Sequence, residues 1–158
     1  SKAANTQVIL TTHSPVIVKE LDFENLRLIY ENENGKCILL AEPAVLQYPS
    51  LNEVNYLAYG EVTEEYHNEL YGFLEFHQWL NDYKNGRQQK PYLYVNNGKT
   101  KTWSLDLTEY VRHQIHHPEN HSNEHFTKDD LRQSIKDMRD YIQKRAEEGM
   151  RDIFSDNE

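Results

Sequence analysis

The most regular spacing of apolar side chains lies in the middle of the chain, between residues 63 and 83. Side chains suited to one buried face recur there at every third or fourth position: Tyr66, Leu70, Phe73, Leu74, His77 and Leu80. This spacing predicts an amphipathic helix with one face packed into a core. Thr63 is placed to cap its first turn. On the opposite face, Glu65, His67 and Glu69 are expected to point into solvent.

A second amphipathic helix is predicted near the end of the chain, starting at Thr127. Thr127 and Asp130 have the spacing of a capping box, in which the two side chains satisfy the first N–H groups of the helix. The apolar stripe that follows consists of Leu131, Ile135, Met138 and Ile142. Residues 146–158 are mostly charged, and we expect them to form a flexible tail.

Alternating or continuous apolar runs predict strands elsewhere. The predicted strands are residues 7–12, 26–30, 37–40, 91–95 and 101–105. The run at 7–12 has the character of a parallel-sheet strand, and Ser14-Pro15 behind it suits the start of a short helix. Asn34-Gly35 and residues 96–99 carry turn signals that join the other strands into hairpins. Residues 52–59 fit another short helix.

These elements predict an α+β fold made of two modules. Residues 5–45 hold a strand, a helix and a hairpin, and residues 46–62 form a connector punctuated by proline and glycine. Residues 63–145 form a mainly helical module with a β-hairpin insertion, and residues 146–158 form the tail. The alternative is one continuous α/β domain.

Composition and charge narrow the class of protein. The 158 residues are 37% apolar and 27% charged, and no apolar run approaches the ~20 residues of a membrane span. The single cysteine, Cys37, excludes an intramolecular disulfide and fits a reducing, cytoplasmic location. A net charge of -9 argues against general coating of nucleic acid but leaves room for a local basic site.

Candidate chemistry gathers in a short predicted helix that Thr108 is expected to cap. The helix should end at or just before His117, because Pro118 cannot continue it. Its last turns contain Arg112, His113, His116 and His117. Arg112 and His117 are separated by roughly 140° on an ideal helix, so a distorted last turn is needed to bring them together. An arginine that binds phosphate beside an imidazole that moves a proton is a sufficient kit for cleaving RNA without metal.

Two other interpretations of this cluster stay open. The basic side chains would also stabilise the negative end of the helix dipole without any catalytic role. Alternatively, His113 and His117 are at the i, i+4 spacing of zinc ligands, with His116, His121 and His125 as further candidates. The preferred interpretation assigns no metal to the cluster.

The segment from Arg112 to His117, Arg-His-Gln-Ile-His-His, resembles the motif of the HEPN family of helical ribonucleases. The loop that starts at His117-Pro118 and the helix predicted from Thr127 repeat the layout of that family. The resemblance implies an antiparallel helical bundle, metal-independent RNA cleavage, and a homodimer that joins two motifs in one cleft. Arg112 would hold the scissile phosphate, His117 would act as general acid or base on the 2′-hydroxyl, and His113 would orient the site.

The segment Leu10-Thr-Thr-His-Ser-Pro15 looks like the switch-histidine loop of ABC-type and OLD-like ATPases, with His13 at the position that faces the terminal phosphate. The resemblance implies that residues 5–45 are the C-terminal part of an ATPase sheet. The sequence contains no phosphate loop, because Gly98-Lys99-Thr100 lacks the upstream glycine and precedes a strand. ATP and Mg²⁺ are therefore expected as cofactors of a longer protein, and this chain alone is not expected to hydrolyse ATP.

Families that combine such parts resemble bacterial anti-phage defence or toxin systems. The leading hypothesis is an ATPase-linked effector whose substrate is RNA, whose helical module needs no cofactor, and whose partners are a second copy and a protein of the same defence operon. It has no membrane partner. The alternative is a non-catalytic interaction or dimerisation module of an SMC-like or OLD-like ATPase.

Overall fold

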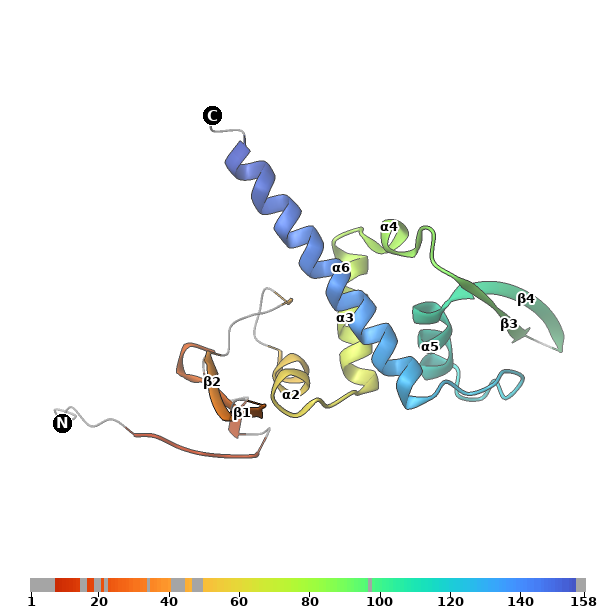
Figure 1. Ribbon diagram of the computed structural model, residues 1–158. Coiled ribbons are helices and arrows are strands. Elements are labelled where there is room, and N and C mark those ends of the chain that lie inside the picture. Colours follow the sequence, from red (N-terminus) through yellow and green to blue (C-terminus); the bar gives the residue numbers. More distant parts are fainter. Residues whose placement is uncertain are drawn as a thin grey trace, which may run out of the picture.

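The computed structural model describes residues 8–14, 17–18, 21, 23–33, 35–40, 45–46, 50–96 and 98–155 (Figure 1). Within these ranges, helices form the main core and the strands form two separate antiparallel hairpins. The α+β class predicted from the sequence is confirmed. None of the described helices is long and apolar enough to cross a membrane.

The strands of the described residues belong to two hairpins. β1 (Arg27–Asn32) pairs with β2 (Gly35–Leu40), and β3 (Gln89–Asn96) pairs with β4 (Lys99–Asp106). Gly35 and Gly98, at the two turns, have positive φ angles of 113° and 72° that favour glycine. The turn signals therefore predicted both hairpins correctly. Because Lys99 begins a strand and not a helix, the Gly98-Lys99-Thr100 segment lacks the setting of a phosphate loop.

The helices with described bounds are α2 (Leu51–Tyr59), α3 (Glu64–Phe76), α4 (Leu80–Lys84), α5 (Leu107–His116) and α6 (Lys128–Ser155), and a short 3-10 turn, η1, spans Phe23–Asn25. Thr63 accepts the Tyr66 N–H at 3.1 Å, which confirms the predicted cap of α3. At the start of α6, Thr127 and Asp130 form the predicted reciprocal cap. α6 continues to Ser155, into the residues that the sequence assigns to a flexible tail.

The main core lies where α3, α5 and α6 pack together, as Figure 1 shows. Its largest contributions come from the two stripes predicted from the sequence: Tyr66, Leu70, Phe73 and Leu74 of α3, and Leu131, Ile135, Met138 and Ile142 of α6. Val111 is the fully buried apolar residue of α5. Burying each such side chain stabilises the fold by about 1.5–3 kcal/mol. The packing of Val111 therefore fixes α5, and with it the candidate cluster, against the two long helices.

The single helix predicted for residues 63–83 is wrong in one respect, because the structure divides it into α3 and α4. Gln78 has a φ of 59°, a left-handed conformation that interrupts the helix. Beyond the break, Tyr83 turns into the core, and its hydroxyl lies 2.7 Å from the Thr108 hydroxyl of α5. The core contact made by Tyr83 depends on tertiary packing, which the spacing of apolar residues does not report.

Residues 8–14 do not form the strand predicted for residues 7–12. Val8, Ile9 and Leu10 run as an irregular segment with exposed fractions of 82%, 81% and 62%. A strand is stable only when its N–H and C=O groups pair with a neighbour, and the described part of the chain offers this segment none. Ile17 and Val18 are helical, as predicted, whereas Leu21, at the end of that predicted helix, lies in a bend. The other residues of that predicted helix lie outside the described ranges.

A buried ion pair ties the predicted connector to the core. Glu53 of α2 is fully buried, and the Arg139 guanidinium of α6 donates to its carboxylate at 2.9 Å. The backbone N–H of Val45 donates to the same oxygen at 3.1 Å. Burial raises the pKa of Glu53, and the charge of Arg139 opposes that rise. Val45 and Leu46, at the predicted module boundary, are themselves buried in the main core.

Candidate functional site

Hydrogen bonds at both ends of α5 fix the position of its last turn. Asp106, the final residue of β4, accepts the Glu109 N–H at 3.1 Å and caps the helix. The cap predicted at Thr108 is wrong because β4 runs directly into the helix, which leaves Thr108 buried in its first turn. At the other end, the His117 N–H donates to the His113 carbonyl at 2.9 Å. The helix ends at His116, because Pro118 disfavours the helical conformation for His117 before it.

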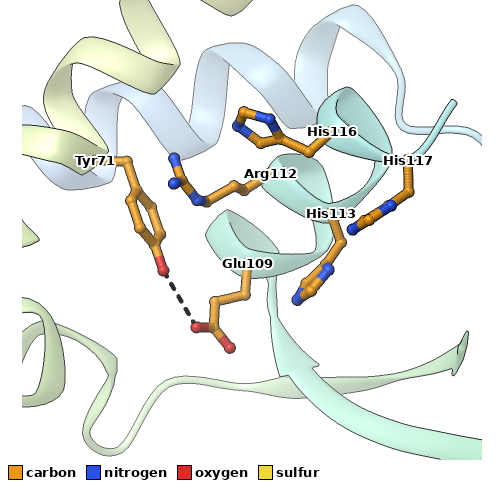
Figure 2. A pocket seen from close by; sticks show the side chains of 6 residues that line it. All are labelled: Tyr71, Glu109, Arg112, His113, His116 and His117. Atoms are coloured by element: carbon orange, nitrogen blue, oxygen red, sulfur yellow. Dashed lines mark hydrogen bonds between the residues drawn. The ribbon is translucent and has the colours of Figure 1, made fainter.

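The last turns of α5 line an open pocket of about 340 Å³ (Figure 2). Its lining consists of Tyr71 from α3 with Glu109, Arg112, His113, His116 and His117 from α5 and its C-cap. The predicted residues Arg112, His113 and His117 therefore share one pocket. His13, the predicted nucleotide residue, is exposed in the irregular segment 8–14, which Figure 1 shows at the opposite end of the molecule from α5.

The end of α5 is distorted, but the distortion does not bring the Arg112 and His117 side chains together. His117 leaves the helical conformation, with φ −130° and ψ 59°. Figure 2 shows the Arg112 guanidinium directed toward Tyr71, with the His113 and His117 rings together on the other side of the helix end. A ligand that contacts both Arg112 and His117 therefore lies across the pocket.

Arg112 rests on an aromatic ring. Its guanidinium carbon lies 3.9 Å from the centroid of the Tyr71 ring. The acidic residue of the lining, Glu109, is engaged elsewhere, because it accepts from Lys84 at 2.5 Å and from the Tyr71 hydroxyl at 3.4 Å. Within the described residues Arg112 has no ion-pair partner. A cation–π contact uses the face of the guanidinium, so its N–H groups remain available to an anion.

Two histidines of the lining are biased toward the neutral form. Partial burial lowers the pKa of His113, and the charges of His117 and Arg112 lower it further against the opposing effect of Glu109. Partial burial and then the charge of Arg112 lower the pKa of His116. The His113 ring stacks on the His117 ring, with centroids 5.9 Å apart and planes 18° from parallel. His113 therefore stacks against the His117 ring while its own charged form is disfavoured.

His117 is oriented by a carboxylate. Its Nδ1 lies 3.2 Å from Oε1 of Glu119, in the loop after α5. Two hydrogen bonds lower the pKa of the Glu119 carboxyl: first the one from its own backbone N–H, and then the one to His117. In a neutral imidazole that donates through Nδ1–H, Nε2 is the basic nitrogen. The His117 side chain is 42% exposed, so its ring is open to a ligand.

A buried polar chain that the sequence did not reveal lies behind the pocket. His67, expected on the solvent face of α3, is fully buried, with Nε2 3.0 Å from the Ser134 hydroxyl of α6. Ser134 donates to Thr108 at 2.8 Å, which links the chain to α5. Burial, and then the charge of Arg112, lower the pKa of His67 to about 4. The expectation for His67 is wrong because α6 covers this face of α3, a contact that residue spacing within α3 cannot indicate.

The remaining histidines of the proposed metal cluster lie apart from the pocket. His121 and His125 are exposed in the loop between α5 and α6, and His125 Nδ1 lies 2.9 Å from its neighbouring carbonyl at Phe126. Among the described residues, no group of three or more His, Cys, Asp or Glu side chains is arranged to hold a metal ion. The five-histidine set considered from the sequence is therefore not assembled in the structure.

Tyr71 is a pocket residue from another helix that sequence reasoning missed. It lies next to the core position Leu70, and nothing in its local sequence separates it from the core tyrosine of the same helix, Tyr66. Only the packing of α5 against α3 brings its ring under Arg112.

Comparisons of this chain with protein-family models, curated protein sequences and solved structures returned no match.

Proposed function

We propose that this chain is the effector part of an ATPase-linked ribonuclease and that it cleaves RNA without a metal ion at the pocket of Arg112 and His117. One observation carries the proposal. A guanidinium with no ion-pair partner among the described residues and an imidazole held by a carboxylate line the same open pocket. The resemblance of the segment Arg112 to His117 to the HEPN motif supports the same reaction.

In this proposal, Nε2 of His117 takes the proton of a ribose 2′-hydroxyl. The 2′-oxygen then attacks the adjacent phosphorus, a new oxygen–phosphorus bond forms, and the bond to the departing 5′-oxygen breaks. Arg112 stabilises the negative charge that develops on the phosphate oxygens, with a planar fork of N–H groups suited to phosphate. His113 acts as a positioning residue that holds the His117 ring by stacking.

The departing 5′-oxygen needs a proton in return, and we propose that a second copy of the motif supplies it. A single motif offers one phosphate-binding group and one imidazole with a carboxylate partner. Positioning an attacking hydroxyl, a phosphate and a leaving oxygen together requires more groups than these. A homodimer with the two α5 helices facing each other would provide them.

The ATPase part of the proposal rests on the resemblance of residues 10–15 to a switch-histidine loop. Residues 5–45 would belong to an ATPase sheet whose phosphate loop lies elsewhere in a longer protein, residues 46–62 would connect it to the effector, and residues 63–145 would form a HEPN-like module. His13 would meet the terminal phosphate of ATP, with Mg²⁺ bound by that ATPase. We place this protein in the cytoplasm of a bacterium, in an anti-phage defence or toxin system.

A second candidate function is a non-catalytic interaction module of an SMC-like or OLD-like ATPase. The observation that favours it is the exposed apolar surface near the start of the chain. Val8 and Ile9 are 82% and 81% exposed, and Ile29 of β1 and Ile38 of β2 are 63% and 70% exposed. Apolar side chains this exposed are suited to contact another protein surface.

Incubating the purified chain with a labelled single-stranded RNA in the presence of a chelator separates the two candidates. The ribonuclease proposal expects cleavage that the chelator does not reduce. It also expects Arg112→Ala and His117→Ala each to lower the cleavage rate by about 100-fold or more, the usual contribution of an acid–base or phosphate-binding group. Arg112→Lys should restore little, because an ammonium cannot make the two-pronged contact.

Matched controls are available outside the pocket. Arg132→Ala and His121→Ala remove the same residue types from exposed positions and should leave the rate unchanged. Thermal unfolding followed by circular dichroism reports whether each variant is folded. Equal rates in Arg112→Ala, His117→Ala and the two controls would refute catalysis at this pocket, and absence of cleavage by the folded chain would favour the interaction module.

A further inference from the structure

The β3–β4 hairpin has two chemically different faces. Its register pairs Tyr92 with Trp103 and Tyr94 with Lys101, so these side chains project from the same face. The alternation places every lysine and every aromatic residue of the hairpin on that face: Lys90, Tyr92, Tyr94, Lys99, Lys101 and Trp103. We call this set the hairpin platform. The opposite face carries aliphatic, hydroxyl and amide side chains with Asp106 at its end.

The outer part of the hairpin platform is a stacked ring pair. The Tyr94 and Trp103 rings lie with centroids 4.3 Å apart and planes 9° from parallel. This pair is continuous with the pocket, because Trp103 meets the His113 ring at 5.3 Å and Tyr94 meets the His117 ring at 6.5 Å, both edge to face. The ring pair therefore lies beside two of the histidines that line the pocket, so a ligand bound there has the pair as its neighbour.

Positive charge lies on the same face, toward the tip of the hairpin. Lys99 and Lys101 are exposed, and neither has an ion-pair partner in the part of the chain that the structure describes. Lys90, nearer the core, differs because its ammonium lies 3.4 Å from the centroid of the Tyr110 ring. The chain as a whole carries a net charge of -9, so these two lysines form a local basic site on an acidic protein.

Rings beside free cations are the features that bind single-stranded nucleic acid. Unpaired bases stack on aromatic side chains, and lysines contact the phosphates between them. A paired duplex hides its base faces and would gain nothing from the Tyr94–Trp103 pair. A protein segment would also be attracted by the lysines, but it would need acidic residues and would gain little from a flat ring stack.

We propose that the hairpin platform is a subsite for the RNA strand beside the scissile phosphate, with one unpaired base stacked on the Tyr94–Trp103 pair and the next phosphates bound by Lys99 and Lys101. This subsite rests on the proposed ribonuclease function, since it extends the same pocket. It assigns the hairpin insertion a role in binding single-stranded RNA, while Arg112 and His117 carry out the cleavage.

Binding is measured with the full 158-residue chain and a fluorescein-labelled, 2′-O-methylated single-stranded oligoribonucleotide, which lacks the free 2′-hydroxyl needed for cleavage. Fluorescence anisotropy should give about tenfold weaker binding for Trp103→Leu and Tyr94→Leu, the loss expected when one base loses its stacking partner. Trp103→Phe keeps a ring and should recover most of the affinity. Phe76→Leu, which removes an aromatic ring that is 82% exposed in α3, is the matched control and should bind normally.

Two further readouts report contact with the hairpin platform directly. Trp79→Phe leaves Trp103 as the single tryptophan of the chain, and its fluorescence should be quenched when the oligonucleotide binds. Lys99→Ala with Lys101→Ala should lower the salt dependence of binding by about one phosphate contact per lysine, whereas Lys128→Ala on α6 should not. Tyr94→Leu and the lysine pair also test the subsite if Trp103→Leu fails to fold.

Different experimental results would refute the subsite and the proposed ribonuclease function. Unchanged affinity in folded Trp103→Leu and Tyr94→Leu, unquenched Trp103 fluorescence, or equal affinity for a duplex of the same sequence would overturn the subsite even if the chain cleaves RNA. An acidic peptide added as a competitor should not displace the bound oligonucleotide. Displacement of the oligonucleotide by the peptide would overturn the subsite. Ring-dependent binding without any cleavage would support the subsite and contradict the ribonuclease.

Discussion

At the level of single residues, the contact between the Arg112 guanidinium and the Tyr71 ring determines how the positive charge of Arg112 is held in the pocket. Burial, and then the negative charge of Glu109, raise the pKa of the Tyr71 phenol to about 12, so its ring stays neutral and faces the guanidinium. The Tyr71 hydroxyl and Lys84 both engage Glu109, which keeps that carboxylate from pairing with Arg112. The guanidinium N–H groups of Arg112 therefore remain open to an anion, and its charge adds to the effect of burial in lowering the pKa of His113, His116 and His67.

The buried His67 provides a prediction about pH. Its pKa is lowered from the ordinary value of 6.5 to about 4, so between these values the unfolded chain binds a proton that the folded chain does not. The free energy of unfolding should therefore fall as the pH drops from 6.5 toward 4, by about 3 kcal/mol from this residue, and should lose no more from it below pH 4. Urea unfolding at a series of pH values measures the effect.

His67→Gln isolates this contribution, because glutamine can keep a hydrogen bond to Ser134 and does not titrate. The variant should unfold with a weaker dependence on pH between 6.5 and 4 than the wild-type chain. His121→Gln, at an exposed position, should retain the wild-type dependence. Identical profiles for the wild-type chain and His67→Gln would show that His67 titrates normally and is not buried in solution.

At the level of secondary structure elements, the junction of β4 and α5 positions the candidate site. Asp106 ends the strand and caps the helix, and burial raises the pKa of its carboxyl. Asp106→Ala should lower the free energy of unfolding by about 1 kcal/mol through loss of the cap. Asp106→Asn keeps an acceptor for the Glu109 N–H and removes a buried charge, so its loss should be smaller. A larger loss in Asp106→Asn than in Asp106→Ala would contradict the role of Asp106 as cap.

Elements defined by local chemistry could be predicted from the sequence, and those defined by distant contacts could not. The caps at Thr63 and Thr127 and the turns at Gly35 and Gly98 depend on a few neighbouring residues, and the structure confirms them. The left-handed Gln78 divides the predicted helix in two, and the contact of Tyr83 beyond the break is with Thr108 of α5, which apolar spacing within one segment does not indicate.

The residues of the candidate site also fall into those that the sequence could predict and those that it could not. The motif located Arg112, His113 and His117 because its residues are adjacent in the sequence, and Pro118 marked where the helix ends. Tyr71 and the hairpin platform reach the pocket only through the packing of α5 against α3 and against the β3–β4 hairpin, so their place beside the pocket could not be predicted from the sequence. The buried state of His67 has the same origin, because it requires α6.

On the scale of the whole molecule, the proposed reaction predicts self-association. Each chain presents one Arg112 and one His117 to the pocket, and a composite cleft would supply the proton for the leaving oxygen from the second copy. Sedimentation velocity of the catalytically active protein should show a dimer. Its specific cleavage activity should fall on dilution below the dissociation constant of that dimer. A strictly monomeric species with constant specific activity would contradict a composite site.

The central claim is that the 2′-hydroxyl of RNA is the nucleophile at this pocket, and a substrate with one 2′-deoxyribose at the cleaved nucleotide tests it most directly. In the presence of chelator, the all-ribose RNA should be cut to give a 2′,3′-cyclic phosphate and a 5′-hydroxyl end, as attack by the 2′-oxygen requires. The substituted RNA should be resistant at that position and cut normally at other sites. Cleavage at the deoxyribose position, or products that carry a 5′-phosphate, would contradict the mechanism assigned to Arg112 and His117.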